Sequence, residues 1–227
     1  MNNSINMARA RLAFNDVDDP IFWAAAEKAA AVTLLTIEKL YNLYQSVRYV
    51  SERGIPGDFV ECGVFKGGAV ILMAQTLVSH KYDLRHIHLF DTFFGFTGRA
   101  EYDVDYGGRE IGNFKTRNFR KEVQSNLKVV PYPTEHYEFV EGDVIETCRS
   151  HCPDVISILR LDTDTYDTTK AELENMFPKL SQGGVLIIDD YGYSKGCKKA
   201  VDEFFVENST KLFLQRPNKS SRTAVKF

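Results

Sequence analysis

The apolar positions of this chain change their period near residue 54. Before that point apolar residues recur at helical spacing: Leu34, Ile37, Leu40, Tyr41, Tyr44 and Val47. The pattern predicts one or two helices over residues 21–53, packed on a sheet or on a partner subunit. Residues 1–20 show no such period, and Asp18–Pro20 is typical of a helix start. Gly54, Pro56 and Gly57 end the helical region.

After residue 57 short apolar runs alternate with helical segments. Five strands are predicted at Asp58–Val60, His86–Phe90, Tyr137–Val140, Val155–Leu161 and Val185–Ile188. Two further strands are predicted at Leu212–Leu214 and Thr223–Phe227. The alternation indicates an α/β fold with a doubly wound, mainly parallel sheet of seven strands. The last pair of strands predicts an antiparallel edge.

A long segment without a predicted element follows the second strand. It contains five glycines: Gly95, Gly98, Gly107, Gly108 and Gly112. Loops of this length in a compact domain are usually functional or disordered. We interpret residues 95–115 as a lid over a binding site.

Size and composition agree with one folded domain. The chain has 227 residues, 44% of them apolar and 26% charged. We expect a helical cap over residues 1–53 and an α/β core over residues 57–227. A net charge of −3 without a basic run argues against nucleic-acid binding. The stretch Trp23–Ile37 is too short and too charged to span a membrane, because Glu27 and Lys28 interrupt it.

The cysteines bear on the cellular compartment. The chain contains Cys62, Cys148, Cys152 and Cys197. Cys148 and Cys152 are four residues apart, which differs from the spacing of a common zinc site. Reduced thiols and the lack of a signal peptide predict a cytoplasmic protein.

The most informative pattern is a row of acids that follows the predicted strands. The acids are Glu61, Asp91, Asp143, Asp162 and Asp189, the last doubled by Asp190. In a doubly wound sheet the carboxyl ends of the parallel strands share one edge, where ligands bind. Carboxylates gathered there repel one another unless cations, hydroxyls or amides lie between them.

The first three acids suggest a nucleoside ligand. Glu61 precedes a glycine-rich turn, where a carboxylate repels a pyrophosphate and suits an amine-bearing ligand such as S-adenosylmethionine. A plain tight turn explains the glycines about as well. Asp91 could accept the ribose hydroxyls of S-adenosylmethionine or NAD, or could cap a helix. Asp143, followed by Val144, could contact an adenine, but alone it is better interpreted as a helix cap.

The last acids suggest a metal. Asp162 ends the fourth strand, and Asp189 and Asp190 end the fifth. Carboxylates on neighbouring strands supply the hard oxygen ligands that Mg²⁺ and Ca²⁺ prefer. Helix capping by Asp164 or a solvated loop around Asp190 would explain one acid each, but not the cluster. No histidine is close in sequence, which argues against zinc.

Four stretches together resemble the macrocin O-methyltransferase family. They are GDFVECGVFKGGA (57–69), LFDTFFGF (89–96), LRLDTDTYDTT (159–169) and LSQGGVLIIDDYG (180–192). The resemblance extends over roughly residues 40–210. It implies a Rossmann-like class I methyltransferase sheet and S-adenosylmethionine as cofactor. It also implies a divalent metal, usually Mg²⁺, and O-methylation of sugar or phenolic hydroxyls in natural products.

The resemblance assigns roles by position. The implied cofactor contacts are Glu61, Gly63, Gly67, Asp91, Thr92, Asp143 and Val144. The implied metal ligands are Asp162, Asp189 and Asp190. Asp162 is the candidate base, with Asp164 left open, and the acceptor is a small molecule with a hydroxyl. The apolar N-terminal helices favour a homo-oligomer, a dimer or a tetramer.

Two other functions stay open. An NAD-linked reductase would use the same sheet edge, but Glu61 and the lack of a third glycine in the turn count against it. A non-catalytic protein that binds S-adenosylmethionine, or a scaffold, would have no use for three metal ligands. The sequence leaves the acceptor unidentified.

Overall fold

The computed structural model describes residues 5–98, 100–112 and 115–227. Its sheet contains β1 (Asp58–Cys62), β2 (Ile87–Asp91), β3 (Tyr137–Glu141), β4 (Ile156–Leu161), β5 (Leu180–Ile188) and β6 (Arg222–Val225). The order across the sheet is β3-β2-β1-β4-β5-β6. The first five strands are parallel, and β6 pairs antiparallel with β5. The predicted doubly wound sheet with an antiparallel edge is confirmed.

The prediction of seven strands is wrong for the described residues, which form six. Residues 212–214 do not form the expected strand, and the nearest sheet-like pairing is a single bridge between Gln215 and Thr223. Leu212 and Leu214 pack against the buried cluster that includes residues of α8, while Phe213 is exposed. Side-chain packing therefore accounts for the apolar alternation without a ladder of backbone hydrogen bonds.

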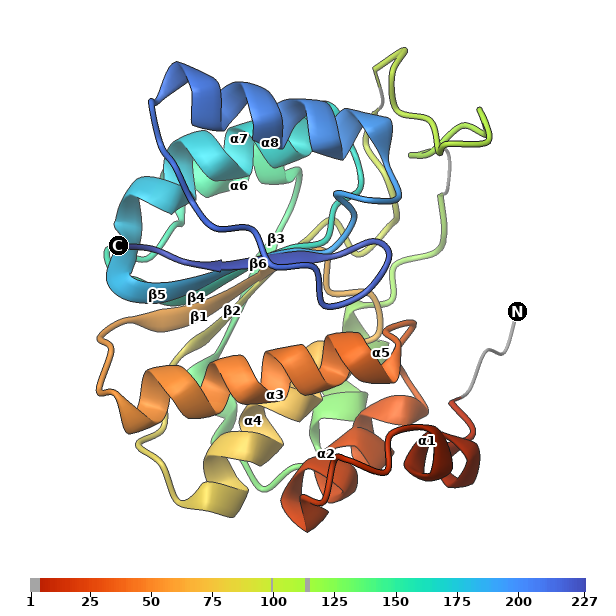
Figure 1. Cartoon of the computed structure of the whole chain (residues 1–227), viewed down its shortest axis with the longest axis vertical. Coiled ribbons are helices and arrows are strands. Elements are labelled where there is room, and N and C mark those ends of the chain that lie inside the picture. Colours follow the sequence, from red (N-terminus) through yellow and green to blue (C-terminus); the bar gives the residue numbers. More distant parts are fainter. Residues whose placement is uncertain (1–4, 99, 113–114) are drawn as a thin grey trace.

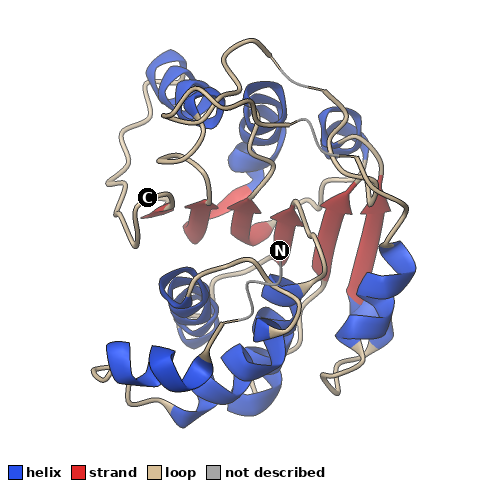
Figure 2. Cartoon of the chain, turned by 90° about the vertical axis from the view of Figure 1, so that its right-hand side faces the viewer, coloured by secondary structure: helices blue, strands red, loops and turns tan. Residues whose placement is uncertain are grey.

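Helices cover both faces of the sheet (Figures 1 and 2). On one face lie α2 (Pro20–Ala30), α3 (Ile37–Glu52), α4 (Gly68–His80) and α5 (Arg120–Leu127). On the other face lie α6 (Val144–Ser150), α7 (Tyr166–Met176) and α8 (Lys195–Glu207). Two short 3₁₀ helices, η1 (Thr134–His136) and η2 (Phe177–Lys179), precede β3 and β5. No helix of the described residues is long and apolar enough to cross a membrane.

One N-terminal helix was not expected. The segment thought to be irregular contains α1 (Met7–Ala13). Asn6 caps it by accepting a hydrogen bond from the backbone N–H of Arg9 at 3.0 Å, and Ala10 is buried. An Asn cap of this kind stabilises a helix start by about 1 kcal/mol. A helix of seven residues is too short to show a clear apolar period, which is why the pattern gave no signal.

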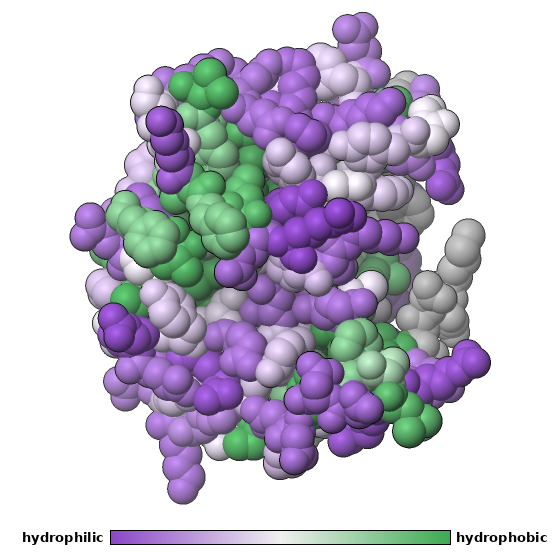
Figure 3. All heavy atoms as spheres, viewed as in Figure 1, coloured by the Kyte–Doolittle hydropathy of each residue, from purple (hydrophilic) through white to green (hydrophobic). Residues whose placement is uncertain are grey.

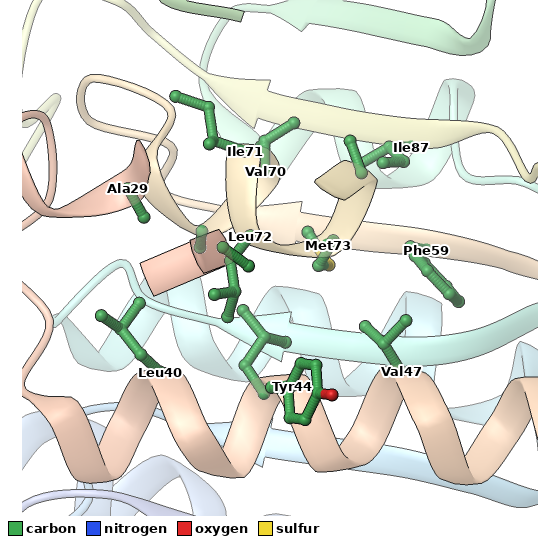
Figure 4. Packing of buried hydrophobic residues seen from close by; sticks show 14 of the residues in the cluster. Ala29, Leu40, Tyr44, Val47, Phe59, Val70, Ile71, Leu72, Met73 and Ile87 are labelled. Atoms are coloured by element: carbon green, nitrogen blue, oxygen red, sulfur yellow. The ribbon is translucent and has the colours of Figure 1, made fainter. Parts of the chain in front are cut away.

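The core fixes α3 against the sheet. Leu40, Tyr44 and Val47 of α3 face Leu72 and Met73 of α4 in the buried cluster (Figure 4). Each of these side chains is at most 1% exposed. Burial of one large apolar side chain contributes roughly 1.5–3 kcal/mol. The position of α3, and of every polar residue at its start, is therefore set by packing.

The middle of the predicted lid, residues 95–115, is bound to the rest of the protein. Its residues 99, 113 and 114 lie outside the described residues. The middle is anchored, because fully buried Asp103 accepts hydrogen bonds from the backbone N–H groups of Ala100 at 2.6 Å and Tyr166 at 2.8 Å. Asp105 forms a β-bridge with Ser194. The two flanks are paired with each other, through a β-bridge between Gly95 and Lys115 and a hydrogen bond from Thr116 N to Phe94 O at 2.8 Å. The lid itself stays a prediction.

Candidate active site

A cavity of about 950 Å³ opens at the carboxyl ends of the parallel strands. Its wall comes from the strand ends, from residues 32–35 and Lys39 of the N-terminal cap, and from both flanks of the lid segment. A space of this size is typical of small-molecule sites. The lining includes the predicted site residues Glu61, Gly63, Asp91, Thr92, Asp143, Val144, Asp162, Asp189 and Asp190. The row of acids therefore surrounds one space.

Gly67 is the predicted site residue that does not line the cavity. It has φ +86° and lies at the N-cap of α4. A Cβ atom there would lie 3.2 Å from Val123 and 3.3 Å from Leu127. In the structure, the role of Gly67 is to let the chain turn into α4 beneath α5.

Gly63 has a different reason to be a glycine. A Cβ atom at this position would lie 2.0 Å from the backbone oxygen of Asp162, which no side chain could tolerate. The residue also has φ +84°. Gly63 therefore lets the ends of β1 and β4 approach closely, next to the pair of Glu61 and Arg160 in the register of the two strands.

Glu61 and Arg160 form a buried ion pair on neighbouring strands. One guanidinium nitrogen donates to Glu61 Oε1 at 2.5 Å, and another donates to Asp162 Oδ2 and Asp189 Oδ1, both at 2.8 Å. Arg160 is 2% exposed. Burial raises the pKa of Glu61 to about 7, although Arg160 opposes the shift. Glu61 Oε2 is buried and has no hydrogen-bond partner.

Asp91 and Asp143 are bound to backbone amides. Asp91 Oδ2 accepts from Val64 N at 2.7 Å and Phe65 N at 3.1 Å, and its Oδ1 accepts from Phe93 N at 2.7 Å. Burial raises the pKa of Asp91, and these hydrogen bonds oppose it. Asp143 caps α6 by accepting from Ile145 N at 3.0 Å. The capping interpretation of Asp143 is thus observed, and its side chain also lines the cavity.

Thr92 and Val144 complete the cavity wall on this side. Thr92 Oγ1 donates to Gly95 O at 2.5 Å and accepts from Phe94 N at 3.0 Å. The hydroxyl therefore shapes the turn after β2. Val144 is 6% exposed and begins α6 directly after Asp143. It supplies an apolar surface beside the acids.

The last acids converge. One carboxylate oxygen each of Asp162, Asp189 and Asp190 lies within 4.8 Å of the other two. Asp190 Oδ2 is buried without a hydrogen-bond partner. Burial raises the pKa of Asp190 well above its usual value, and the neighbouring carboxylates of Asp164 and Asp189 add to the shift. Three converging oxygen donors with an unpaired one among them fit a hard divalent cation.

Asp189 differs from its neighbours. Burial would raise its pKa, but Arg160 and Lys39 outweigh this effect and hold the pKa below its usual value. Lys39 Nζ donates to Asp189 Oδ2, and Arg160 donates to Oδ1. Asp189 is therefore a stable anion with a cation on each oxygen.

Asp164 also lines the cavity. Its backbone has φ +65°, a conformation that L residues rarely adopt, just before α7. Burial raises its pKa to about 7, and the carboxylates of Asp162 and Asp189 add to the shift. The capping role considered for Asp164 is not observed, because Thr165 occupies the N-cap of α7 and makes no side-chain cap bond.

Two site residues were missed from the sequence, Lys39 and Arg160. A signal for Arg160 existed, because a charge inside the apolar run of β4 must find counter-charges. Lys39 gave none, because it lies beside the apolar stripe of α3 and could equally face water. Its partner, Asp189, is 150 residues away in sequence.

The fold, the acids and the cavity define a class of protein, the Rossmann-like methyltransferases. Over residues 10–216 the chain matches the sequence profile of the macrocin O-methyltransferases. It is 35% identical over 180 residues to demethyldecarbamoylnovobiocin O-methyltransferase of Streptomyces niveus, covering 78% of this chain and 68% of that protein. It is 30% identical over 181 residues to mycinamicin III 3″-O-methyltransferase of Micromonospora griseorubida, covering 77% and 70%. The chain belongs to the macrocin O-methyltransferase family and is an S-adenosylmethionine-dependent O-methyltransferase.

Solved structures agree with this assignment. The O-methyltransferase NovP superposes with a TM-score of 0.77 at 32% identity, over 86% of this chain and 82% of that one. A more distant match, a caffeoyl-CoA O-methyltransferase fold from Staphylococcus aureus, has a TM-score of 0.57 at 12% identity, over 98% and 99%. The second likeness supports the fold alone.

Proposed function

We propose that this enzyme methylates a hydroxyl of a sugar or another natural-product small molecule, with Mg²⁺ held by Asp162, Asp189 and Asp190. The observation that carries the proposal is one cavity that contains two buried, unpaired carboxylate oxygens, Glu61 Oε2 and Asp190 Oδ2. Two carboxylate oxygens that lack partners, on residues that line one cavity, suit two cationic ligands. The names of the relatives support the acceptor class, since they include a rhamnosyl-tetracenomycin 4′-O-methyltransferase.

The cofactor would lie along β1, β2 and the start of α6. Glu61 lines the cavity, and its unpaired Oε2 is suited to accept from the α-amino group of S-adenosylmethionine. Asp91 Oδ2 accepts two of its three amide bonds and Oδ1 accepts one, so one lone pair on Oδ1 is left to accept from a ribose hydroxyl. Asp143 and Val144 provide an acceptor and an apolar surface for the adenine. S-adenosylmethionine supplies the methyl group.

The metal ligands fit Mg²⁺ by their chemistry. All three are carboxylates, and Mg²⁺ prefers hard oxygen ligands and keeps open positions for substrate oxygens. A bound divalent cation lowers the pKa of a hydroxyl and orients it. On the protein side, Arg160 donates to both Asp162 and Asp189, and so fixes two of the three carboxylates.

Asp162 is the proposed base. Its side chain is 25% exposed, against 3% for Asp189, so it can reach an acceptor in the cavity. Arg160 donates to Oδ2, so Oδ1 is the oxygen that would accept the hydroxyl proton, with its second lone pair left for the cation. Burial raises the pKa of Asp162 well above its usual value against the opposing effect of Arg160, with Asp189 and Asp190 adding to the shift. Asp164, whose pKa is raised to about 7, is the alternative base.

Calorimetry with the purified chain tests cofactor binding, and a methyl-transfer assay with and without Mg²⁺ tests the metal. We expect S-adenosylhomocysteine to bind, NAD not to bind, and Mg²⁺ to support methyl transfer to a deoxysugar acceptor. Tight NAD binding without S-adenosylhomocysteine binding would favour the reductase. Cofactor binding without transfer to any hydroxyl acceptor would favour a non-catalytic binder. Full turnover in excess chelator would remove the metal from the proposal.

Compartment and assembly remain proposals as well. The four cysteines are free, which fits a reducing cytoplasm. The proposal of a homo-oligomer is supported by an apolar area of the surface, which extends over the end of α8 and the C-terminus (Figure 3). Exposed apolar side chains in the C-terminal part of the chain are Val206 at the end of α8, Phe213 and the last residue, Phe227. Light scattering of the purified chain tests whether it is a dimer or a tetramer.

A further inference from the structure

Lys39 of α3 occupies the acidic cluster at the ends of β4 and β5. Its ammonium donates to Asp189 Oδ2, and its side chain is 13% exposed. A lysine is positively charged at neutral pH. Lys39 therefore places an ammonium against one of the three proposed metal ligands.

The stability of α3 does not explain this placement. Lys39 is the third residue of α3, where the positive end of the helix dipole disfavours a cation. Glu38, one residue earlier, is the residue there that suits the dipole. The apolar stripe of α3 supplies the packing. The position of Lys39 is explained by the acids that it contacts.

Arg160 and Lys39 differ in how firmly they are held. Arg160 lies within β4 at 2% exposure and contacts three carboxylates, so it cannot leave without breaking the core. Lys39 lines the cavity and reaches Asp189 through a flexible four-carbon chain. Rotation of this side chain would move the ammonium away from Asp189 without a change in the backbone.

A divalent cation and an ammonium cannot share one carboxylate oxygen at contact distance, because like charges repel strongly in a partly buried site. Resting on the metal site proposed above, we propose that Lys39 competes with the divalent cation for Asp189. The ammonium neutralises the cluster before the metal binds and is displaced into the cavity when the metal binds. Lys39 thereby weakens the affinity of the site for the cation and ties metal binding to the N-terminal cap.

The first test measures Mn²⁺ binding to the full chain, with the free ion followed by electron paramagnetic resonance. The variants are Lys39→Met and, as a control, Lys66→Met. Lys66 lines the same cavity but pairs with Glu122 at 2.9 Å. We expect Lys39→Met to bind Mn²⁺ at least about tenfold more tightly than the parent chain, and Lys66→Met to stay within about twofold. Equal or weaker binding by Lys39→Met overturns the competition.

The same titration separates the two proposals. If the parent chain binds Mn²⁺ and Asp189→Asn does not, the metal site stands, whatever Lys39 does. If neither the parent chain nor Lys39→Met binds Mn²⁺ or Mg²⁺, the metal site itself fails, and the competition fails with it.

A second test uses the unmodified chain and does not depend on the folding of a variant. Acetic anhydride labels lysines according to the accessibility of their amines, and peptide mass spectrometry reports the labelling of each residue. We expect Mg²⁺ to increase the labelling of Lys39 and to leave that of Lys66 unchanged. Labelling of Lys39 that is unchanged or reduced by Mg²⁺ overturns the displacement.

Discussion

The acids on the two halves of the sheet edge are held in different ways. On the β2 and β3 side, Asp91 and Asp143 accept hydrogen bonds from backbone amides: Asp91 from the turns after β1 and β2, and Asp143 from the start of α6. On the β4 and β5 side, Asp162 and Asp189 are paired with the side chains of Arg160 and Lys39. Similar residues at equivalent strand ends are therefore held by backbone amides on one side and by side-chain cations on the other.

This difference separates two tasks of one crevice. Backbone donors are part of the turn, so they fix the geometry of the half that would hold the cofactor. Side-chain cations neutralise the half that would hold the metal, and one of them can be exchanged for an ion. Arg160 joins the halves, because it contacts Glu61 on one side and Asp162 and Asp189 on the other.

Removal of Arg160, the residue that joins the two halves, should have the largest effect on stability. In Arg160→Met three carboxylates would lose a buried counter-charge, and loss of one partner of such a pair costs about 3–5 kcal/mol. We expect the free energy of unfolding in urea to fall by that amount. Arg120→Met is the control, because Arg120 is 38% exposed and pairs with Glu141, and it should cost about 1 kcal/mol or less. A loss at residue 160 no larger than at residue 120 would contradict a linking role.

Asp189→Asn should affect the metal half alone. Loss of a carboxylate ligand is expected to weaken Mn²⁺ binding by more than about 100-fold, since even residues that only orient ligands cost 10- to 100-fold. Turnover should fall with it. S-adenosylhomocysteine affinity, measured by calorimetry on the same preparation, should change little. Equal losses of metal and cofactor binding would mean that the two halves are not separable.

Glu61→Gln should affect the cofactor half. It removes the charge that would face the α-amino group, and a hydrogen bond to a charged group contributes about 1.5–3 kcal/mol. We expect S-adenosylhomocysteine to bind roughly 10- to 100-fold more weakly by calorimetry. An analogue without the amino group should bind both proteins alike. An equal loss for the analogue would place the amine elsewhere.

The pH dependence sharpens the role of Glu61. Its pKa in the folded chain is about 7, raised from 4.5 mainly by burial. Its contribution to stability is thus present below 4.5 and lost as the pH rises through about 7, because the unfolded chain releases the proton first. Urea unfolding should show that Glu61→Gln lacks this loss. Cofactor affinity should rise over the same range in the parent chain, and identical profiles for the two proteins would contradict the assignment.

Asp143→Ala should have the smallest effect. The cap of α6 contributes about 1 kcal/mol, which lowers the melting temperature by a few degrees at most. Cofactor affinity should fall modestly if Asp143 also contacts the adenine. An effect on stability without any effect on affinity would make Asp143 a cap alone.

Much of the fold followed from local patterns. Four of the five parallel strands were predicted within two residues, because their apolar runs are short and bounded by turns, whereas β5 begins at Leu180, five residues before the predicted start. The incorrect predictions of secondary structure have local reasons. Residues 212–214 alternate like a strand but only pack, and α1 is too short to show a period. The acids at the strand ends line one cavity, as expected, because parallel strands end on the same side of a sheet.

What the sequence determined by itself was the row of acids, the sheet edge on which they lie and the family to which the chain belongs. Only the tertiary structure decided which cations neutralise the row. Arg160 meets Glu61 across 99 residues, and Lys39 meets Asp189 across 150. The physical reason is that periodicity tells which face of an element is buried but carries no information about the partner that a charge finds after the chain has folded.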